Sequence, residues 1–280
     1  MERFIGIIGM VILLVIAFAL SNNKKAINYK TVGVGLALQI IFGIFIFKVP
    51  VGQKIFLWLG EVIVKLLEFA NVGGKFVYGP LLDDKQMGTV FGCSIPFAFQ
   101  LISATVFMMM IVNILYYYGI MQRVVTVLGK AMNKLMKVSG AEALSNVASA
   151  FVGQVTAQIM IKPYLAKLTR SELLASMAGS MACTSGAMMP VYAMMGIPIV
   201  YVLASAIMAI PGALVMTKLV YPETGEPETM ENIKLSRRKT HSNVFDAIAS
   251  GASEGMMVSL NVVAMLLAIV ALIAMIDYIL

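Results

Sequence analysis

Several uncharged, apolar runs in this sequence are long enough to cross a lipid bilayer, which limits the chain to a small set of folds. A transmembrane helix needs about 20 consecutive apolar residues. Such runs cover residues 4–20, 31–47, 86–122 and 255–276. Only 12% of the residues are charged, whereas soluble domains average about 25%. The sequence therefore predicts an all-α polytopic membrane protein.

One more apolar run, residues 173–217, is too long for a single crossing. The segment MGIPIV at residues 195–200 interrupts it with a glycine and a proline, which favour a turn. The run is therefore predicted to form two spans joined by a tight turn. The first run of the chain also fits a secretory signal, since Ala17–Ala19 matches a cleavage site. Glu2 offsets Arg3, however, and further spans follow directly, which favours a retained span.

Two segments of mixed polarity are predicted to be amphipathic helices that lie in the membrane interface. In each segment the four charged residues follow one another at steps of 7, 4 and 3, which places them on one narrow helical face. The other residues are mostly apolar, so such a helix can lie among the headgroups, although a core helix of an extramembrane domain would have the same pattern. The charged residues are Lys54, Glu61, Lys65 and Glu68 in segment 53–70, and Arg123, Lys130, Lys134 and Lys137 in segment 121–140. Residues 241–255 form a weaker third candidate.

The distribution of basic residues predicts an orientation. Cytoplasmic loops of membrane proteins are enriched in lysine and arginine. If the N-terminus lies outside, 15 of the 21 basic residues fall in cytoplasmic loops, provided that residues 143–161 enter from the cytoplasm and return to it. The sequence thus predicts a multi-pass protein of the plasma (inner) membrane with a re-entrant hairpin. Topology explains the basic residues, so no nucleic-acid partner is expected.

The predicted hairpin carries polar residues at its turn. In FVGQVTAQIMIKPYL, residues 151–165, Gly153 permits a turn and Gln154 offers both a hydrogen-bond donor and an acceptor. Thr156 and Gln158 extend the polar surface. Irregular backbone at membrane depth is tolerated where it lines a cavity, and helix ends exposed there can bind a polar solute or an ion. The alternative is that these side chains only hydrogen-bond neighbouring helices.

A second polar patch lies in MACTSGAMMPVYAMMG, residues 181–196. Its polar or helix-breaking members are Cys183, Thr184, Ser185, Gly186 and Pro190. Discontinuous helices of this kind form transporter sites near the midplane of the membrane. The alternative is a proline kink that packs through small residues.

The residue content disfavours several classes of site. His241 is the only histidine and no Cys/His cluster exists, which excludes a zinc site. Cys93 and Cys183 both lie in apolar runs and are interpreted as buried thiols. No nucleophile is paired with a base and no phosphate-binding loop is found. The chain is therefore predicted not to be an enzyme and to need no cofactor.

Segments 149–186 and 204–228 carry several spaced motifs. The first reads SAFVGQVTAQIMIKPYLAKLTRSELLASMAGSMACTSG and the second reads ASAIMAIPGALVMTKLVYPETGEPE. These motifs agree in order with those of the concentrative nucleoside transporter family. The chain resembles that family in detail over residues 141–280 and in layout over residues 4–140.

The resemblance implies membrane spans, interfacial helices and two re-entrant hairpins, assembled as a homotrimer in the lipid bilayer. It implies secondary active uptake of nucleosides by symport of a cation, Na+ or H+. It divides the chain into a scaffold at residues 1–140, a nucleoside-recognition region at 141–218, and a region at 219–280. That last region would contain a cytoplasmic linker, an interfacial helix and the start of a transport region. Members of the family continue beyond the equivalent of Leu280, so the alternative is a non-transporting membrane subunit or an inert fragment that needs a separate C-terminal half.

The resemblance also implies site residues. The family's base-contacting glutamine falls on Gln154, and Val155, Thr156 and Gln158 complete the implied substrate-binding set. Val155 and Thr156 stand where the family has threonine and glutamate, and Gln158 stands where it has proline. The cation-binding positions of sodium-coupled members fall on Ser149, Val152, Cys183 and Thr184. Serine for asparagine and cysteine for serine weaken an oxygen cage, which leaves Na+ and H+ open, and no other metal is expected.

Overall fold

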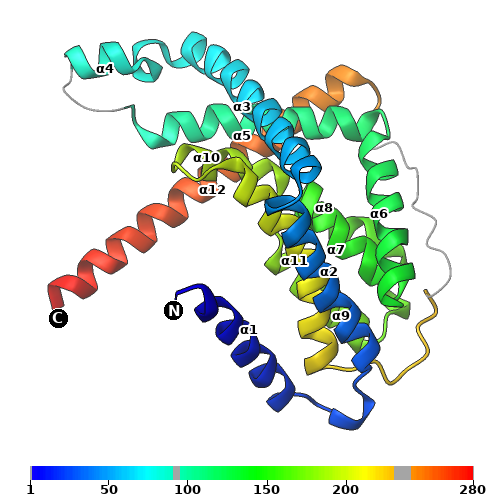
Figure 1. Cartoon of the computed structure of the whole chain (residues 1–280). Helices are drawn as coiled ribbons and strands as arrows, with labels where there is room; N and C mark the ends of the chain where they lie inside the picture. The colour runs from blue at the N-terminus through cyan, green and yellow to red at the C-terminus, as the bar shows by residue number, and fades with distance from the viewer. Residues whose placement is uncertain (1, 91–94, 230–240, 280) are drawn as a thin grey trace. The chain divides into compact units, whose positions relative to one another are not determined.

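The computed structural model describes residues 2–90, 95–229 and 241–279, and all regular structure in these ranges is helical (Figure 1). The α-helices are α1 (Glu2–Ala19), α2 (Tyr29–Phe47), α3 (Pro50–Tyr78), α4 (Asp84–Val90), α5 (Phe97–Tyr117), α6 (Ile120–Met136), α7 (Gly140–Val152), α8 (Gln154–Ile161), α9 (Arg170–Ala182), α10 (Met189–Met194), α11 (Ile199–Val220) and α12 (Val244–Ile279). Short 3-10 turns lie at Lys24–Ala26, Gly79–Leu82, Lys162–Lys167 and Gly186–Met188.

Within the described ranges, four helices are long and apolar enough to cross a membrane. They are α2, α5, α11 and α12. Helix α1 contains a shorter apolar stretch, Ile8–Ala19. Many large apolar side chains of α1, α2 and α12 are exposed, as expected for surfaces that meet lipid rather than water. The prediction of an all-α polytopic membrane protein is confirmed.

The helices form two compact units, each assembled from three separate parts of the sequence. The first unit comprises Met1–Leu57, Met121–Gly186 and Val200–Arg237. The second comprises Trp58–Ile120, Ala187–Ile199 and Arg238–Leu280. These units are defined by which residues pack together and say nothing about the function of each segment. The division into functional regions at residues 140 and 218 therefore stays a prediction.

In the first unit, α2 and α11 approach closely through glycines. A Cβ on Gly35 would overlap the side chain of Val215, and a Cβ on Gly212 would overlap that of Gln39. The Gln39 side-chain amide donates to the carbonyl oxygen of Met208 at 3.2 Å. Small residues and polar side chains of this kind hold helices together where lipid removes the hydrophobic driving force.

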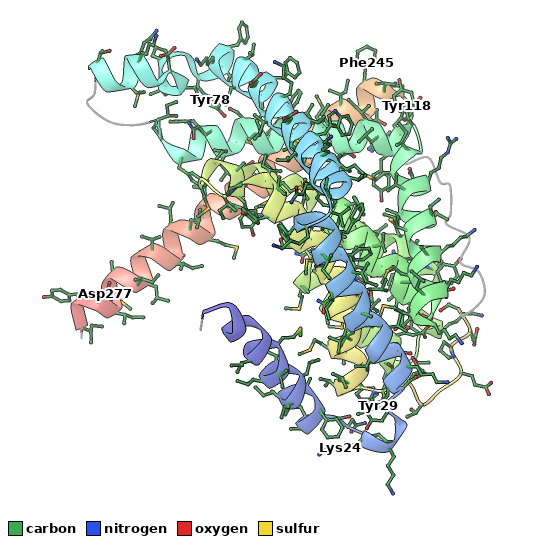
Figure 2. The ribbon with its side chains drawn as sticks, viewed as in Figure 1. Lys24, Tyr29, Tyr78, Tyr118, Phe245 and Asp277 are labelled. Carbon is green, nitrogen blue, oxygen red and sulfur yellow. The ribbon has the colours of Figure 1, made fainter. Side chains whose placement is uncertain are left out.

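The second unit is built around the contact between α5 and α12. Helix α12 presents a stripe of small, buried residues at intervals of four, namely Ala247, Gly251, Gly255 and Ser259. A Cβ on Gly255 would lie only 2.6 Å from the Cα of Val106 in α5, so the two backbones are in direct contact. Phe245 and Asp277 mark the two ends of the long helix α12 (Figure 2).

Two of the three expected amphipathic helices are present. Helix α3 carries all four charges of its stripe, whereas α6 carries three of its four, because it ends at Met136 and Lys137 follows it at a φ of +53°. All eight charged side chains are exposed. The third candidate, residues 241–255, is wrong as a separate interfacial helix, because α12 begins at Val244 and continues without interruption into the apolar span. The glycines of that segment serve close packing on α5 instead of a turn. Residues 91–94 and 230–240, which include Cys93 and most of the expected linker, lie outside the described residues.

The pair of spans expected at residues 173–217 is only partly correct. Helix α11 forms the second span, and the turn before it contains Gly196 at a φ of +85°. The first is not continuous, because α9 ends at Ala182 and α10 begins at Met189. The interruption coincides with the polar patch that the sequence analysis singled out.

Candidate functional site at a helical hairpin

Helix α7 begins with a capping box. The backbone N–H of Glu142 donates to Ser139 Oγ at 3.3 Å, and the N–H of Ser139 donates to Glu142 Oε1 at 2.7 Å. The helix has 13 residues. It is thus about 20 Å long, which is too short to cross a hydrocarbon core of about 30 Å. Together with α8 it forms the predicted re-entrant hairpin.

Gly153 forms the tip of this hairpin. Its φ of +93° and ψ of 162° lie in a region that is open only to glycine. Its N–H donates to the Ser149 carbonyl at 3.2 Å, and its own carbonyl accepts from Ala157 at 3.1 Å. The last carbonyls of α7 and the first N–H groups of α8 therefore meet at one point, where they have no partner within their own helices. A tip of this kind presents both acceptors and donors to a polar solute.

The interruption between α9 and α10 lies against the hairpin tip. A Cβ on Gly153 would be 3.0 Å from Ser185 Oγ. A Cβ on Gly186 would be 2.8 Å from the carbonyl oxygen of Phe151. The structure thus brings together the two polar, helix-breaking patches that are separate in the sequence. The residues of both patches up to Gly186 belong to the first unit.

A network of hydroxyl groups holds α7, α8 and α9 together behind the tip. Ser145 and Ser176 Oγ atoms are 2.7 Å apart, and those of Ser149 and Ser180 are 3.1 Å apart. The Gln158 side-chain amide donates to Ser180 Oγ at 2.5 Å, and its oxygen accepts from Ser176 Oγ at 3.0 Å. The Gln158 side chain is therefore engaged between helices and is not free at the tip.

Gln154 differs from Gln158 in its surroundings. It is the first residue of α8, and its side chain is exposed. Within the described part of the chain it forms no side-chain hydrogen bond. The backbones of Val155 and Thr156 continue the first turn of α8, while their side chains lie outside what the structure describes. Gln154 thus keeps its full donor and acceptor capacity at the hairpin tip.

The four residues expected to bind a cation all belong to the first unit, but two of their side chains have other partners. Ser149 Oγ is buried and donates to the Ser145 carbonyl at 2.8 Å. The Cys183 thiol lies 3.9 Å from the carbonyl oxygen of Asn146. Thr184 is half-buried, and the side chain of Val152 is not described. Among the described residues no group of three His, Cys, Asp or Glu side chains could hold a metal ion.

The base of the hairpin contains a buried ion pair. Lys218 Nζ in the last turn of α11 lies 2.8 Å from Glu142 Oε2, and the two side chains are only 8% and 1% exposed. The same ammonium group donates to Ser171 Oγ at 3.0 Å and lies 3.5 Å from Glu223 Oε2. The first turns of α7 and α9 are therefore both tied to the end of α11.

A second capping box opens α9 and extends this cluster. The Thr169 backbone N–H donates to Glu172 Oε2 at 2.7 Å, and the Thr229 hydroxyl donates to Glu172 Oε1 at 2.7 Å. The Thr229 carbonyl in turn accepts from the Gly140 N–H at 2.9 Å. The segment after α11 thus connects the starts of both helices.

The sequence analysis did not predict the supporting role of these residues, although signals for it exist. Both capping boxes match the pattern of serine or threonine followed three residues later by glutamate. The pairs Ser145/Ser149 and Ser176/Ser180 each repeat at an interval of four on one helical face. Lys218 is one of the 15 basic residues that the orientation argument places in cytoplasmic loops, which is wrong, because it lies buried in the last turn of α11. It ends an apolar run, and only the fold reveals that it turns inward to Glu142.

Comparison with known families gives a consistent assignment along the chain. The family described as "Na+ dependent nucleoside transporter N-terminus" matches residues 8–81. The family described as "Nucleoside recognition" matches residues 98–199, which include the hairpin and the α9 break. The "Na+ dependent nucleoside transporter C-terminus" family matches residues 201–280.

Individual relatives agree with this assignment. The uncharacterised transporter YutK of Bacillus subtilis is 40% identical over 276 residues, which cover 98% of this chain and 67% of the relative. The nucleoside permease NupC of Helicobacter pylori is 33% identical over 272 residues, which cover 97% of this chain and 64% of the relative. A structure of CNTnw in an inward-facing, substrate-bound state has a TM-score of 0.92 at 37% identity, covering 98% of this chain and 66% of that one.

The chain belongs to the Na+-dependent nucleoside transporter family, that of the concentrative nucleoside transporters. It spans about two thirds of the length of these relatives.

Proposed function

We propose that this chain takes part in secondary active uptake of nucleosides across the plasma membrane, with substrate recognition at the hairpin tip. The observation that carries the proposal is the exposed Gln154, which has no side-chain hydrogen bond among the described residues, at the point where the α7–α8 hairpin meets the interruption after α9. Family membership and the names of the relatives support transport, and nothing in them points to an enzyme.

The proposed role of Gln154 is to bind the nucleobase. A carboxamide pairs a donor with an acceptor, which matches the alternating donors and acceptors on the edge of a base. The free N–H groups at the start of α8 add further donors beside it. Val155 and Thr156 share this first turn and are the other proposed contacts. Gln158 is proposed to position the hairpin, because its amide is already bound to Ser176 and Ser180.

The coupling ion is proposed to be a proton. A sodium ion prefers several hard oxygen ligands, and a thiol is a poor one. The Ser149 hydroxyl donates its hydrogen to the Ser145 carbonyl and shares a contact with Ser180, while Cys183 offers sulfur. The matching family is described as Na+ dependent, which favours sodium. The ion comparison in the experiment below decides between them.

The arrangement in the membrane is also part of the proposal. Placing the N-terminus outside puts most basic residues in cytoplasmic loops, in agreement with the positive-inside rule. Assembly as a homotrimer follows from the family resemblance.

The test is uptake of labelled uridine and adenosine, with and without Na+, by cells that lack their own nucleoside transporters and express this chain. We expect concentrative uptake that depends on a pH gradient and that Gln154→Ala reduces. Loss of hydrogen bonds that the base needs costs about 1–3 kcal/mol, or roughly 5- to 150-fold in apparent affinity. Gln86→Ala, which changes another exposed glutamine, is the matched control. Binding without uptake by a chain shown to reach the membrane would contradict transport and favour the non-transporting alternative.

A further inference from the structure

The charged stripes of helices α3 and α6 have the same spacing in the sequence but differ in charge. On α3 the stripe contains two lysines and two glutamates, and Lys65 pairs with Glu68 at 2.8 Å. On α6 all three members, Arg123, Lys130 and Lys134, are cations, and a fourth cation, Lys137, follows directly after the end of the helix at a φ of +53°. The spacing of the charged residues is explained by an amphipathic helix of either kind. The uniform positive charge of α6 needs a separate explanation.

The packing of α6 fixes the direction in which this stripe points. Val125, Met132 and Met136 are buried on the opposite face of the helix. Gly129 lies on the same buried face, where a Cβ would be 3.4 Å from the Cα of Leu144 in α7. Because α6 is held against the hairpin by this face, it cannot roll to bring its cations inward.

The four cations have no partner of their own in the described structure. Each is exposed, and none forms an ion pair with a carboxylate in the described ranges. Figure 2 shows side chains with nitrogen tips along the outer edge of α6. Unpaired cations on a fixed face are available to a negatively charged partner.

Exposed apolar side chains accompany the cations on α6. Val127 is 67% exposed and lies three positions before Lys130, so the two side chains are neighbours on one face. Leu135 is 50% exposed and follows Lys134 at the flank of that face. Cations beside exposed aliphatic side chains are typical of helices that lie on anionic membranes, where the cations meet phosphates and the aliphatic groups meet acyl chains. A soluble phosphate compound has no acyl chains that could contact these aliphatic side chains.

We propose that the outer face of α6, made of Arg123, Lys130 and Lys134 with Val127 and Leu135, binds the headgroups of anionic phospholipids together with Lys137 just beyond the helix. The phosphate is held by the ammonium and guanidinium groups, and the aliphatic side chains contact the upper part of the acyl chains. Since the opposite face of α6 rests on α7, the bound lipid adjoins the element that supports the hairpin. Zwitterionic lipids, whose headgroups carry no net charge, bind this face less tightly.

The experiment measures binding of a fluorescent phosphatidylglycerol to the purified 280-residue chain in nanodiscs of phosphatidylcholine. The variant Lys130→Gln/Lys134→Gln removes two cations from α6. The control Lys54→Gln/Lys65→Gln removes two from the mixed stripe of α3 and changes the net charge equally. Glutamine retains high helix propensity, so both helices persist, and circular dichroism checks this.

We expect phosphatidylglycerol affinity to fall about 25-fold in the α6 variant, or roughly fivefold per cation, and less than threefold in the α3 control. Added salt weakens the wild-type binding. Equal effects of the two variants would overturn the proposal, because net charge alone would then explain them. Displacement of the lipid by millimolar glycerol phosphate would also overturn it, because the site would then serve a soluble phosphate. The experiment measures lipid binding and not nucleoside transport. A negative result would therefore contradict the lipid proposal without contradicting the proposed function.

Discussion

Substitution of Lys218 tests whether the buried ion pair supports the hairpin. In Lys218→Met the ammonium group is lost, while the aliphatic length of the side chain is largely kept. The carboxylate of Glu142 is 1% exposed, and within the described structure Lys218 is the charged partner of its Oε2 atom. Its Oε1 atom keeps the hydrogen bond from Ser139. A buried charge is thus left without compensation.

The expected cost follows from this burial. Removing one partner of a buried pair destabilises a protein by about 3–5 kcal/mol, because the remaining charge cannot recover its solvation. Removing both charges is far less costly, so Lys218→Met/Glu142→Gln should lie within about 2 kcal/mol of the wild type. The distinctive expectation is that the double variant is more stable than the single variant Lys218→Met.

Reversible unfolding in mixed micelles measures these free energies. Lys167→Met is the matched control. Its partner Glu228 lies 2.8 Å away and raises the pKa of Lys167, but the two side chains are 61% and 60% exposed. Exposed pairs of this kind contribute little to stability, because water screens the two charges. The reasoning is refuted if Lys218→Met costs no more than this control, or if Glu142→Gln adds to the loss instead of relieving it.

Three further substitutions probe the hairpin. Gly153→Ala should cost about 1–3 kcal/mol and weaken nucleoside binding, because its backbone angles are strained for any residue with a Cβ; unchanged stability and binding would contradict that geometry. Gly179→Ala should destabilise the protein by about 1–3 kcal/mol, since the added Cβ would overlap the buried Asn146 amide. The control Gly33→Ala places its Cβ in open space and should stabilise the protein by about 0.5–1 kcal/mol. Thermal unfolding compares the two variants, and equal shifts in their melting temperatures would contradict the overlap. Gln158→Leu should cost about 1–3 kcal/mol, because the hydrogen bonds between its side-chain amide and the hydroxyls of Ser176 and Ser180 are lost. A variant as stable as the wild type would remove the positioning role.

The features that the sequence predicts best are those with a local physical cause. Apolar runs predict spans, and steps of 7, 4 and 3 predict the exposed stripes of α3 and α6, because both patterns depend only on helical geometry. The glycine at 153 and the polar patch at 183–186 predict the two breaks, since few residues tolerate such backbone. Their meeting at the hairpin tip was expected only through the family resemblance.

The features that the sequence predicts poorly depend on distant partners. Lys218 and Glu142 are 76 positions apart, and neither shows from its neighbours that it will be buried in a pair. Gln154 and Gln158 look equivalent in the sequence, yet one is exposed and the other is bound to α9. The prediction of a separate helix at the start of α12 was wrong because the glycines of this segment pack on α5. A packing partner on another helix cannot be recognised from the neighbouring sequence.

Equilibrium binding of labelled uridine to the purified chain, wild type against Gln154→Ala and Gln86→Ala, tests most directly the claim that the hairpin tip recognises nucleosides. The account predicts saturable binding that Gln154→Ala weakens about tenfold or more, because the exposed amide at the tip supplies contacts to the base. Gln86→Ala should leave the affinity unchanged. Saturable binding that survives Gln154→Ala undiminished, or no binding by a folded chain, would contradict it.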